Sequence, residues 1–202
     1  LTSGDHVWDQ RGFDAEIDRF DRVLRPANLQ QGQPGRGWGV YRNPAGGEIA
    51  VINLQGKVFM RESAYNPFET VERILAEELP KSVKSIFVDF HAEATSEKLA
   101  MGYLLDGRVT AVLGTHTHVP TADALVLPGG TARQTDVGMT GAATSVLGRD
   151  VKDVLYKFTT GMPNRLAVVE KGPIRLDGTV VSYDYLTGRA TDIRPVSREI
   201  TI

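Results

Sequence analysis

The sequence predicts an α/β fold in which parallel strands alternate with helices. Two short apolar runs, Ser85–Phe90 and Val109–Leu113, have the length and composition of buried strands. A helical pattern of apolar residues lies between them and closes at Asp106-Gly107. This order predicts a right-handed β-α-β unit over Ser85–Leu113, with both strands parallel in one sheet.

Length and composition indicate one domain over residues 1–202, with 41% hydrophobic and 24% charged residues. A net charge of −2 gives no basic footprint for binding nucleic acid through its phosphates. The chain has no cysteine, which excludes disulfides, zinc–thiolate sites and a cysteine nucleophile. This composition is compatible with a reducing compartment, and we expect a cytoplasmic protein. No apolar run approaches the ~20 residues that a membrane span needs.

The first part of the chain is expected to hold one helix and three strands. The helix is expected over Gly12–Leu24, where apolar residues recur at three- and four-residue spacing, and Pro26 ends it. The strands are expected over Trp38–Arg42, Glu48–Leu54 and Lys57–Met60, the last two paired around Gln55-Gly56. A turn at residues 43–47 and a polar loop at residues 61–66 separate these elements from their neighbours.

Capping residues predict two further helices. Asn66 is a good N-cap with Pro67 in the first helical position, and Pro80 ends that helix. A second helix is expected over Asp150–Thr159, capped by Asp150. Strands are then expected over 165–169, 174–176, 179–185 and 193–200, with turns at Asp177-Gly178 and Thr187-Gly188.

The chain has four histidines, His6, His91, His116 and His118, and each is expected directly after a strand. In open α/β sheets, ligands bind at that edge. If the His-Thr-His segment is extended, its two imidazoles point to one side and can bind one metal or two neighbouring metals. A short motif of this kind also occurs as two loop histidines without a ligand.

Asp5 and His6 follow a glycine turn at Gly4, which lets the backbone bend sharply. An adjacent Asp and His can serve as a metal ligand and a proton donor, although Asp5 can also simply cap the next turn. Together the candidate residues supply one carboxylate and up to four imidazoles. Such donors suit iron, manganese, zinc or nickel.

Four stretches resemble one protein family. Thr2–Asp9, Val88–Lys98, Gly114–Asp123 and Thr135–Gly141 resemble the bacterial YmdB-like phosphodiesterases, which are calcineurin-like metallophosphoesterases. The resemblance extends over essentially the whole chain. It implies a four-layer α/β/β/α sandwich with a two-metal centre of iron or manganese, hydrolysing phosphodiesters such as 2′,3′-cyclic nucleotides.

Carried over by position, the resemblance implies that Asp5, His91 and His116 bind one metal and that His118 binds the other. It gives His6 the role of the general acid that protonates the leaving oxygen. Two metals roughly 3.5–4 Å apart would clamp the phosphate during in-line displacement. The implied partners are a small-molecule phosphodiester substrate and further copies of the chain in a homo-oligomer, with no membrane.

The chain departs from the family pattern in two respects. The family has Asn where this chain has Asp5, and its first two motifs, a GD strand end and a Glu-Asn pair, are missing. We therefore expect the domain to be N-terminally incomplete, by roughly 60 residues at ~30 per strand–helix unit. Asp5, His91 and His116 alone form a possible 2-His-1-carboxylate site for one metal. A non-catalytic metal- or nucleotide-binding regulatory module and a mononuclear oxygenase are the alternatives.

Three acidic residues near His91 have less specific interpretations. Glu93 and Glu97 either hydrogen-bond metal-binding histidines or simply favour the dipole of the following helix. Asp89 precedes His91 by two positions and is a candidate for orienting a neighbouring group.

Overall fold

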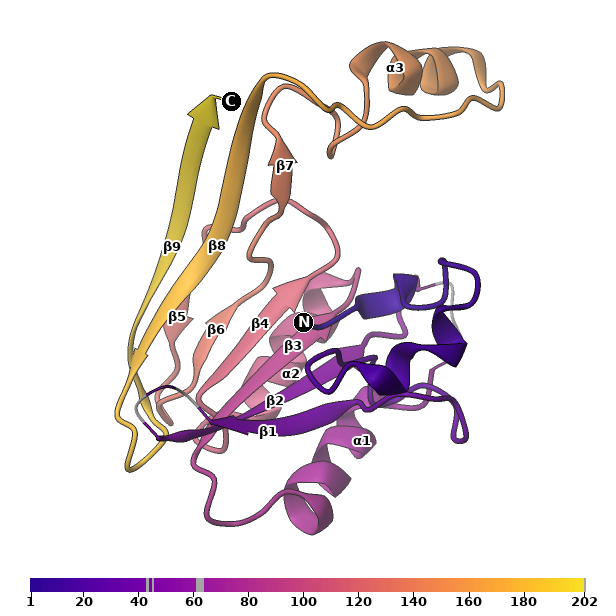
Figure 1. Ribbon diagram of the computed structural model, residues 1–202. Coiled ribbons are helices and arrows are strands. Elements are labelled where there is room, and N and C mark those ends of the chain that lie inside the picture. Colours follow the sequence, from indigo (N-terminus) through magenta and orange to yellow (C-terminus); the bar gives the residue numbers. More distant parts are fainter. Residues whose placement is uncertain (43, 45, 61–63, 202) are drawn as a thin grey trace.

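The computed structural model describes residues 1–42, 44, 46–60 and 64–201. Within them, the larger sheet has six strands in the order β1-β2-β3-β4-β6-β5 (Figure 1). β2, β3, β4 and β6 are parallel, and the edge strands β1 and β5 are antiparallel to their neighbours. The strands span Trp38–Arg42 (β1), Glu48–Gln55 (β2), Ser85–His91 (β3), Ala111–Thr115 (β4), Leu125–Val126 (β5) and Ala132–Gln134 (β6).

The predicted β-α-β unit is confirmed. β3 leads into helix α2 (Thr95–Leu104), and β4 returns parallel to β3. The register pairs Phe87 with Ala111 and His91 with Thr115. The carboxyl ends of β3 and β4 therefore lie side by side, which brings His91 and His116 to the same edge of the sheet.

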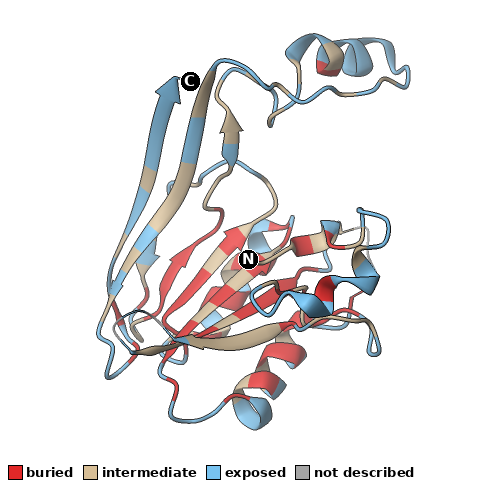
Figure 2. Cartoon of the chain, in the orientation of Figure 1, coloured by how far each residue is buried: buried red, intermediate tan, exposed pale blue. Residues whose placement is uncertain are grey.

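Helices α1 (Pro67–Arg73) and α2 pack on one face of this sheet. The N-cap prediction is confirmed, because the Asn66 side chain accepts a hydrogen bond from Phe68 N at 3.0 Å. The helix continues as a π-helical turn over Ile74–Glu78 and stops before Pro80. Side chains from both helices and the sheet form one buried core, shown red in Figure 2, that includes Ile52, Leu54, Val71, Ile74, Val88, Phe90, Met101 and Leu105.

A second sheet consists of β7 (Thr140–Ala142), β8 (Pro173–Tyr183) and β9 (Ala190–Thr201), all antiparallel. Its lower end packs on the opposite face of the larger sheet, where the rings of Phe87 and Tyr183 meet edge to face with centroids 5.6 Å apart. Its upper end extends away from the body, with helix α3 (Val151–Thr160) at the far end (Figure 1). The α/β fold is therefore confirmed, but a fourth layer of helix over the second sheet is not.

The prediction of one helix over Gly12–Leu24 is wrong. The segment forms two short 3-10 helices, Phe13–Ala15 and Ile17–Arg19. Leu24 N donates to Leu1 O at 2.8 Å, and Leu24 forms β-bridges with Thr2 and Arg36. This pairing requires an extended backbone at Leu24, and the long helix is lost for that reason.

Two strand predictions are also wrong. Lys57–Met60 forms a turn, because Lys57 N donates to the Glu97 carboxylate and Phe59 has φ 64. Residues 165–169 were expected to form a strand, but their described β pairing is a single bridge between Val168 and Arg149.

The turn predictions had mixed outcomes. The turn at Asp177-Gly178 is wrong, since β8 runs through it and pairs Asp177 with Ser197. The turn at Thr187-Gly188 and the helix capped by Asp150 are confirmed. The loops expected at residues 43–47 and 61–66 fall partly outside the described residues.

In the described parts, no helix has the length and apolar character of a membrane span.

Candidate metal centre

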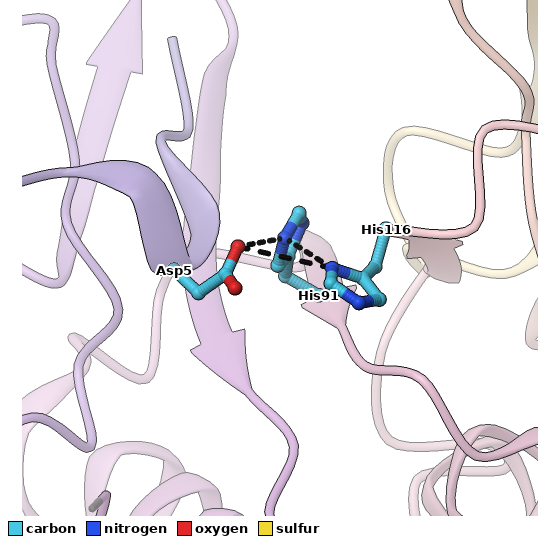
Figure 3. Close-up of side chains that lie close together, drawn as sticks. All are labelled: Asp5, His91 and His116. Carbon is cyan, nitrogen blue, oxygen red and sulfur yellow. Dashed lines mark hydrogen bonds and ion pairs between the residues drawn. The ribbon is translucent and has the colours of Figure 1, made fainter. Parts of the chain in front are cut away.

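Three of the predicted site residues meet at the carboxyl edge of the larger sheet. Asp5 lies in a 3-10 helix (Gly4–His6), His91 is the last residue of β3, and His116 follows β4. Asp5 Oδ1 is 2.8 Å from His91 Nε2, and His116 Nδ1 is 3.1 Å from the same nitrogen. Asp5 Oδ1 and His116 Nδ1 are 3.8 Å apart (Figure 3).

The geometry of these donor atoms fits a single cation. All three distances fall within the ~4 Å that two bonds of ~2.0–2.1 Å to a common ion permit. A carboxylate oxygen and two unprotonated imidazole nitrogens repel one another unless a proton or a cation lies between them. Two imidazoles and one carboxylate suit iron, manganese, zinc or nickel. The structure therefore brings together the three residues that the sequence assigned to one metal, and metal binding by them stays a prediction.

Hydrogen bonds fix the orientation of His91. The Thr115 hydroxyl donates to Asp89 Oδ1 at 2.7 Å, so its oxygen is free to accept from His91 Nδ1 at 2.9 Å. This arrangement places the His91 proton on Nδ1 and leaves the lone pair of Nε2 facing Asp5 and His116. Asp89 thus has the orienting role considered for it, acting through Thr115.

The pKa shifts favour the protonation states that a metal requires. Burial lowers the pKa of His91, although the hydrogen bond that a protonated Nε2 would donate to Asp5 opposes this shift. Burial alone would raise the pKa of Asp5, but the hydrogen bond with His91 in its protonated form and the charge of the neighbouring imidazoles when protonated outweigh it and keep that pKa below its usual value. A charged Asp5 beside a neutral His91 is the ligand state for metal binding.

Gly4 permits the close approach of the Asp5 segment to His91. Gly4 has φ +63, and a Cβ there would lie 2.5 Å from Cε1 of the His91 ring. A larger residue would therefore meet both a strained backbone and the imidazole. The sharp bend expected at Gly4 is present.

His118 lies outside the group formed by Asp5, His91 and His116. The His-Thr-His segment is not extended, because His116 has φ 100 and His118 has φ 67. His118 is exposed and lines a pocket of about 150 Å³ with Met139, Arg175 and Asp177. His116 instead lines a separate pocket of about 260 Å³. The expectation that both imidazoles share one side is wrong, because it assumed a strand conformation.

His6 lies on the solvent side of the group formed by Asp5, His91 and His116. Its side chain is 67% exposed, with Nε2 3.7 Å from Asp5 Oδ1 and Nδ1 2.7 Å from Asp9 Oδ2. It lines the same pocket as Asp5 and His116, together with Phe59 and Met60. The sequence predicted a strand directly before His6. The structure has only a single β-bridge there, at Thr2.

The two glutamates have different roles. Glu93 Oε2 lies 3.2 Å from His116 Nε2, so Glu93 contacts a candidate ligand on the side away from His91. Glu97 is buried and accepts hydrogen bonds from Lys57 N at 3.0 Å and Val58 N at 3.3 Å. Glu97 therefore holds the segment before Phe59 and makes none of the described contacts with the histidines.

Sequence reasoning missed Asp136. Its Oδ2 accepts hydrogen bonds from Thr117 N at 3.0 Å and from Thr117 Oγ1 at 2.7 Å, so it contacts the residue between His116 and His118. Asp136 lies in Thr135–Gly141, one of the stretches that resemble the family, but the resemblance did not single out this carboxylate.

Comparisons with known proteins identify relatives of this chain in sequence and in structure. Over 196 residues the chain is 45% identical to the 2′,3′-cyclic-nucleotide 2′-phosphodiesterase of Bacillus subtilis (strain 168), covering 97% of this chain and 73% of that protein. A crystal structure of a hypothetical protein from Thermus thermophilus matches with TM-score 0.88 and 39% identity, over 98% of this chain and 75% of that one. A crystal structure of a phosphatase from Mycoplasma pneumoniae matches with TM-score 0.87 and 32% identity, over 98% and 71%.

These relatives support a phosphodiesterase function and a hydrolytic enzyme, as the sequence predicted. The family described as YmdB-like protein matches residues 1–196. The chain therefore belongs to the family of YmdB-like proteins.

Proposed function

We propose that the site hydrolyses small phosphodiesters such as 2′,3′-cyclic nucleotides with the help of bound metal ions. The observation that carries this proposal is the convergence of Asp5, His91 and His116, whose ligand atoms all lie within 4.8 Å of one another. The substrate class follows the name of the Bacillus subtilis relative. A net charge of −2 favours a small substrate over a nucleic-acid polymer.

The donor chemistry supports a division of roles. Asp5, His91 and His116 would hold one iron or manganese ion, and His118 would contribute to a second. When bound, such ions act as Lewis acids on phosphate oxygens and supply a nucleophile at neutral pH. Thr115 and Asp89 keep the Nε2 lone pair of His91 directed at the site.

His6 is proposed as the general acid. Asp9 holds Nδ1 of His6 at 2.7 Å, and this leaves Nε2 directed toward Asp5 and the shared pocket. A protonated Nε2 can donate to the oxygen that leaves phosphorus, while Asp9 stabilises the charge on the ring. Because the side chain is exposed, it can regain its proton from water.

One observation favours a second candidate, a non-catalytic module that binds a metal or nucleotide. Among the described residues, Asp5, His91 and His116 form the one group of three donors that could hold a metal, and His118 lies outside it. A single filled site would bind a ligand without the second ion that two-metal hydrolysis uses.

Three broader features are part of the proposal. The four-layer sandwich is supported by α1 and α2 on one face of the larger sheet and by β8 and β9 on the other. A single domain over residues 1–202 rests on length and composition, a cytoplasmic location on the absence of cysteine, and a homo-oligomer on the family resemblance. Light scattering on the purified chain tests the oligomer, and cell fractionation tests the location.

The test compares metal content and hydrolysis of 2′,3′-cyclic AMP in four proteins. We expect the His116→Ala variant to lose the bound metal and turnover, and the His118→Ala variant to keep one metal per chain but lose turnover. Asp192→Asn, an exposed carboxylate in β9, is the control and should behave as wild type. Unchanged turnover in His116→Ala would rule out the proposal, and tight binding without turnover in wild type would favour the module.

A further inference from the structure

A buried ion pair lies outside the three-donor group. Lys98 Nζ is 3.0 Å from Asp136 Oδ2, and the two side chains are 3% and 0% exposed. Lys98 belongs to α2, and Asp136 follows β6 in the chain. Burying two charges is unfavourable unless further hydrogen bonds use their remaining capacity. The partners of Asp136 therefore indicate what the ion pair holds in place.

Asp136 holds the loop that carries both histidines. Its Oδ2 accepts from Thr117 N at 3.0 Å and from Thr117 Oγ1 at 2.7 Å. Its Oδ1 accepts from Gly138 N at 2.9 Å. Both carboxylate oxygens are thus used, and Lys98 offsets the charge that they share. Thr117 is fixed through its backbone and its side chain at once.

The backbone around Asp136 also fixes both ends of this loop. Val137 N donates to Gly114 O at 3.0 Å, and Thr121 N donates to Asp136 O at 3.0 Å. Thr135 O passes so close to Gly114 that a Cβ at Gly114 would lie 1.7 Å from it. The strand end at Gly114 and the exit at Thr121 are therefore both attached to the segment that carries Asp136.

The loop needs this support because its backbone is unfavourable. His116 has φ 100 and His118 has φ 67, values that residues with a Cβ rarely adopt. Such conformations persist where the surrounding structure determines them fully. Between them, Thr117 has both its N–H and its hydroxyl bound to Asp136.

We propose that Asp136, held by Lys98, is a positioning residue that directs His116 toward Asp5 and His91 and thereby sets the affinity of the site for a divalent cation. This inference rests on the proposed function, in which those three residues hold a metal. Asp136 itself makes no described contact with them and acts through Thr117. The expected effect is that of an outer hydrogen-bond partner, about 10–100-fold in metal affinity.

The experiment titrates the whole chain with Co²⁺ and follows the visible absorption of the bound ion, which reports its ligand geometry. We expect Asp136→Asn to raise the Kd for Co²⁺ by about 10–100-fold and to alter the spectrum. Thr117→Val, which removes only the hydroxyl contact and keeps the ion pair, should weaken binding less. In the metal-free protein, the Thr117 amide should exchange with deuterium faster in Asp136→Asn than in wild type.

Two further variants define the range of outcomes. Asp106→Asn is the matched control, since its carboxylate also holds backbone amides, at Gly129 and Thr131, but makes no described contact with the histidine loop. It should bind Co²⁺ as wild type does. The double variant Lys98→Met/Asp136→Asn carries no buried charge at this position. If Asp136→Asn fails to fold, the double variant replaces it and should show the same loss of affinity.

The outcomes separate the two proposals. If wild type binds Co²⁺ while Asp136→Asn or its replacement and Thr117→Val retain wild-type affinity and spectrum, the positioning role is overturned and the proposed function stands. If wild type binds Co²⁺ no better than His116→Ala, the proposed metal site fails and the positioning role fails with it.

Discussion

The Cα of Gly4 lies directly against the imidazole of His91. A Cβ at Gly4 would stand 2.5 Å from Cε1 and 2.6 Å from both ring nitrogens, which is closer than real Cβ contacts allow. Two segments that lie far apart in the sequence thus meet at a contact that only glycine permits.

We expect Gly4→Ala to weaken metal binding and hydrolysis by about 100-fold, since displacing a site by ~1 Å has effects of that size. The methyl group must displace either the ring of His91 or the segment that carries Asp5. Gly12→Ala is a matched control, because Gly12 has φ +84 but nothing within 4 Å of its Cβ position. It carries the same backbone strain without the contact, so equal losses in both variants would show that strain alone is responsible.

The second prediction concerns the charge of Asp5. Asp5→Asn keeps an oxygen donor but removes the negative charge that faces His91 and His116. We expect a lower affinity for Mn²⁺, by at least about tenfold, measured by isothermal titration calorimetry at pH 7. Asp192→Asn serves as the control for a charge lost elsewhere. An affinity equal to wild type would show that the carboxylate charge does not contribute to metal binding.

The third prediction concerns the pH dependence of folding without metal. Because the pKa of His91 is lowered in the folded protein, the unfolded chain binds more protons at this residue. Its contribution to stability is present above the ordinary histidine pKa of 6.5 and is lost as the pH falls below it. Asp5 acts in a lower window, because its lowered pKa places the loss below its ordinary value of 3.8.

The measurement for His91 is urea unfolding of the metal-free protein between pH 7.5 and 4.5. Wild type should lose stability on acidification, and His91→Gln should lose less because the titrating group is gone. Parallel curves for the two proteins would exclude a contribution from His91. His6→Gln is the comparison for a histidine on the solvent side of the same site.

The fourth prediction concerns Glu97. We expect Glu97→Gln to lower the free energy of unfolding by about 1–3 kcal/mol, because the backbone amides of Lys57 and Val58 lose the charged acceptor that the buried Glu97 side chain provides. Glu72→Gln breaks an exposed pair with Arg108 and should cost about 1 kcal/mol or less. Chemical denaturation measures both. If the two costs were equal, Glu97 would be no more important than a surface carboxylate.

Local signals explain what could be predicted from the sequence. The β-α-β unit follows from two apolar runs around an amphipathic segment, and the helix starts follow from side chains such as Asn66 and Asp150 that cap the next turn. The three candidate metal-binding residues could also be predicted from local signals. His91 and His116 follow apolar strands, and Asp5 follows a glycine bend.

The remaining features depend on partners that are distant in sequence. Asp177-Gly178 favours a turn locally, but pairing with β9 along the whole of β8 outweighs that preference. The direction of His118 depends on the backbone of His116, and the role of Asp136 depends on Thr117, 19 positions earlier. Nothing in the local pattern of either segment reveals such contacts.

The alignment of β3 with β4 has a consequence for how the protein matures. A slip of one residue between these strands would turn the His91 side chain to the opposite face of the sheet. His91 would then lie apart from Asp5 and His116, so only chains with correctly paired strands could bind an ion at the proposed site. Since a ligand that binds only the native state stabilises it by mass action, the captured ion would favour the correct pairing over every shifted alternative.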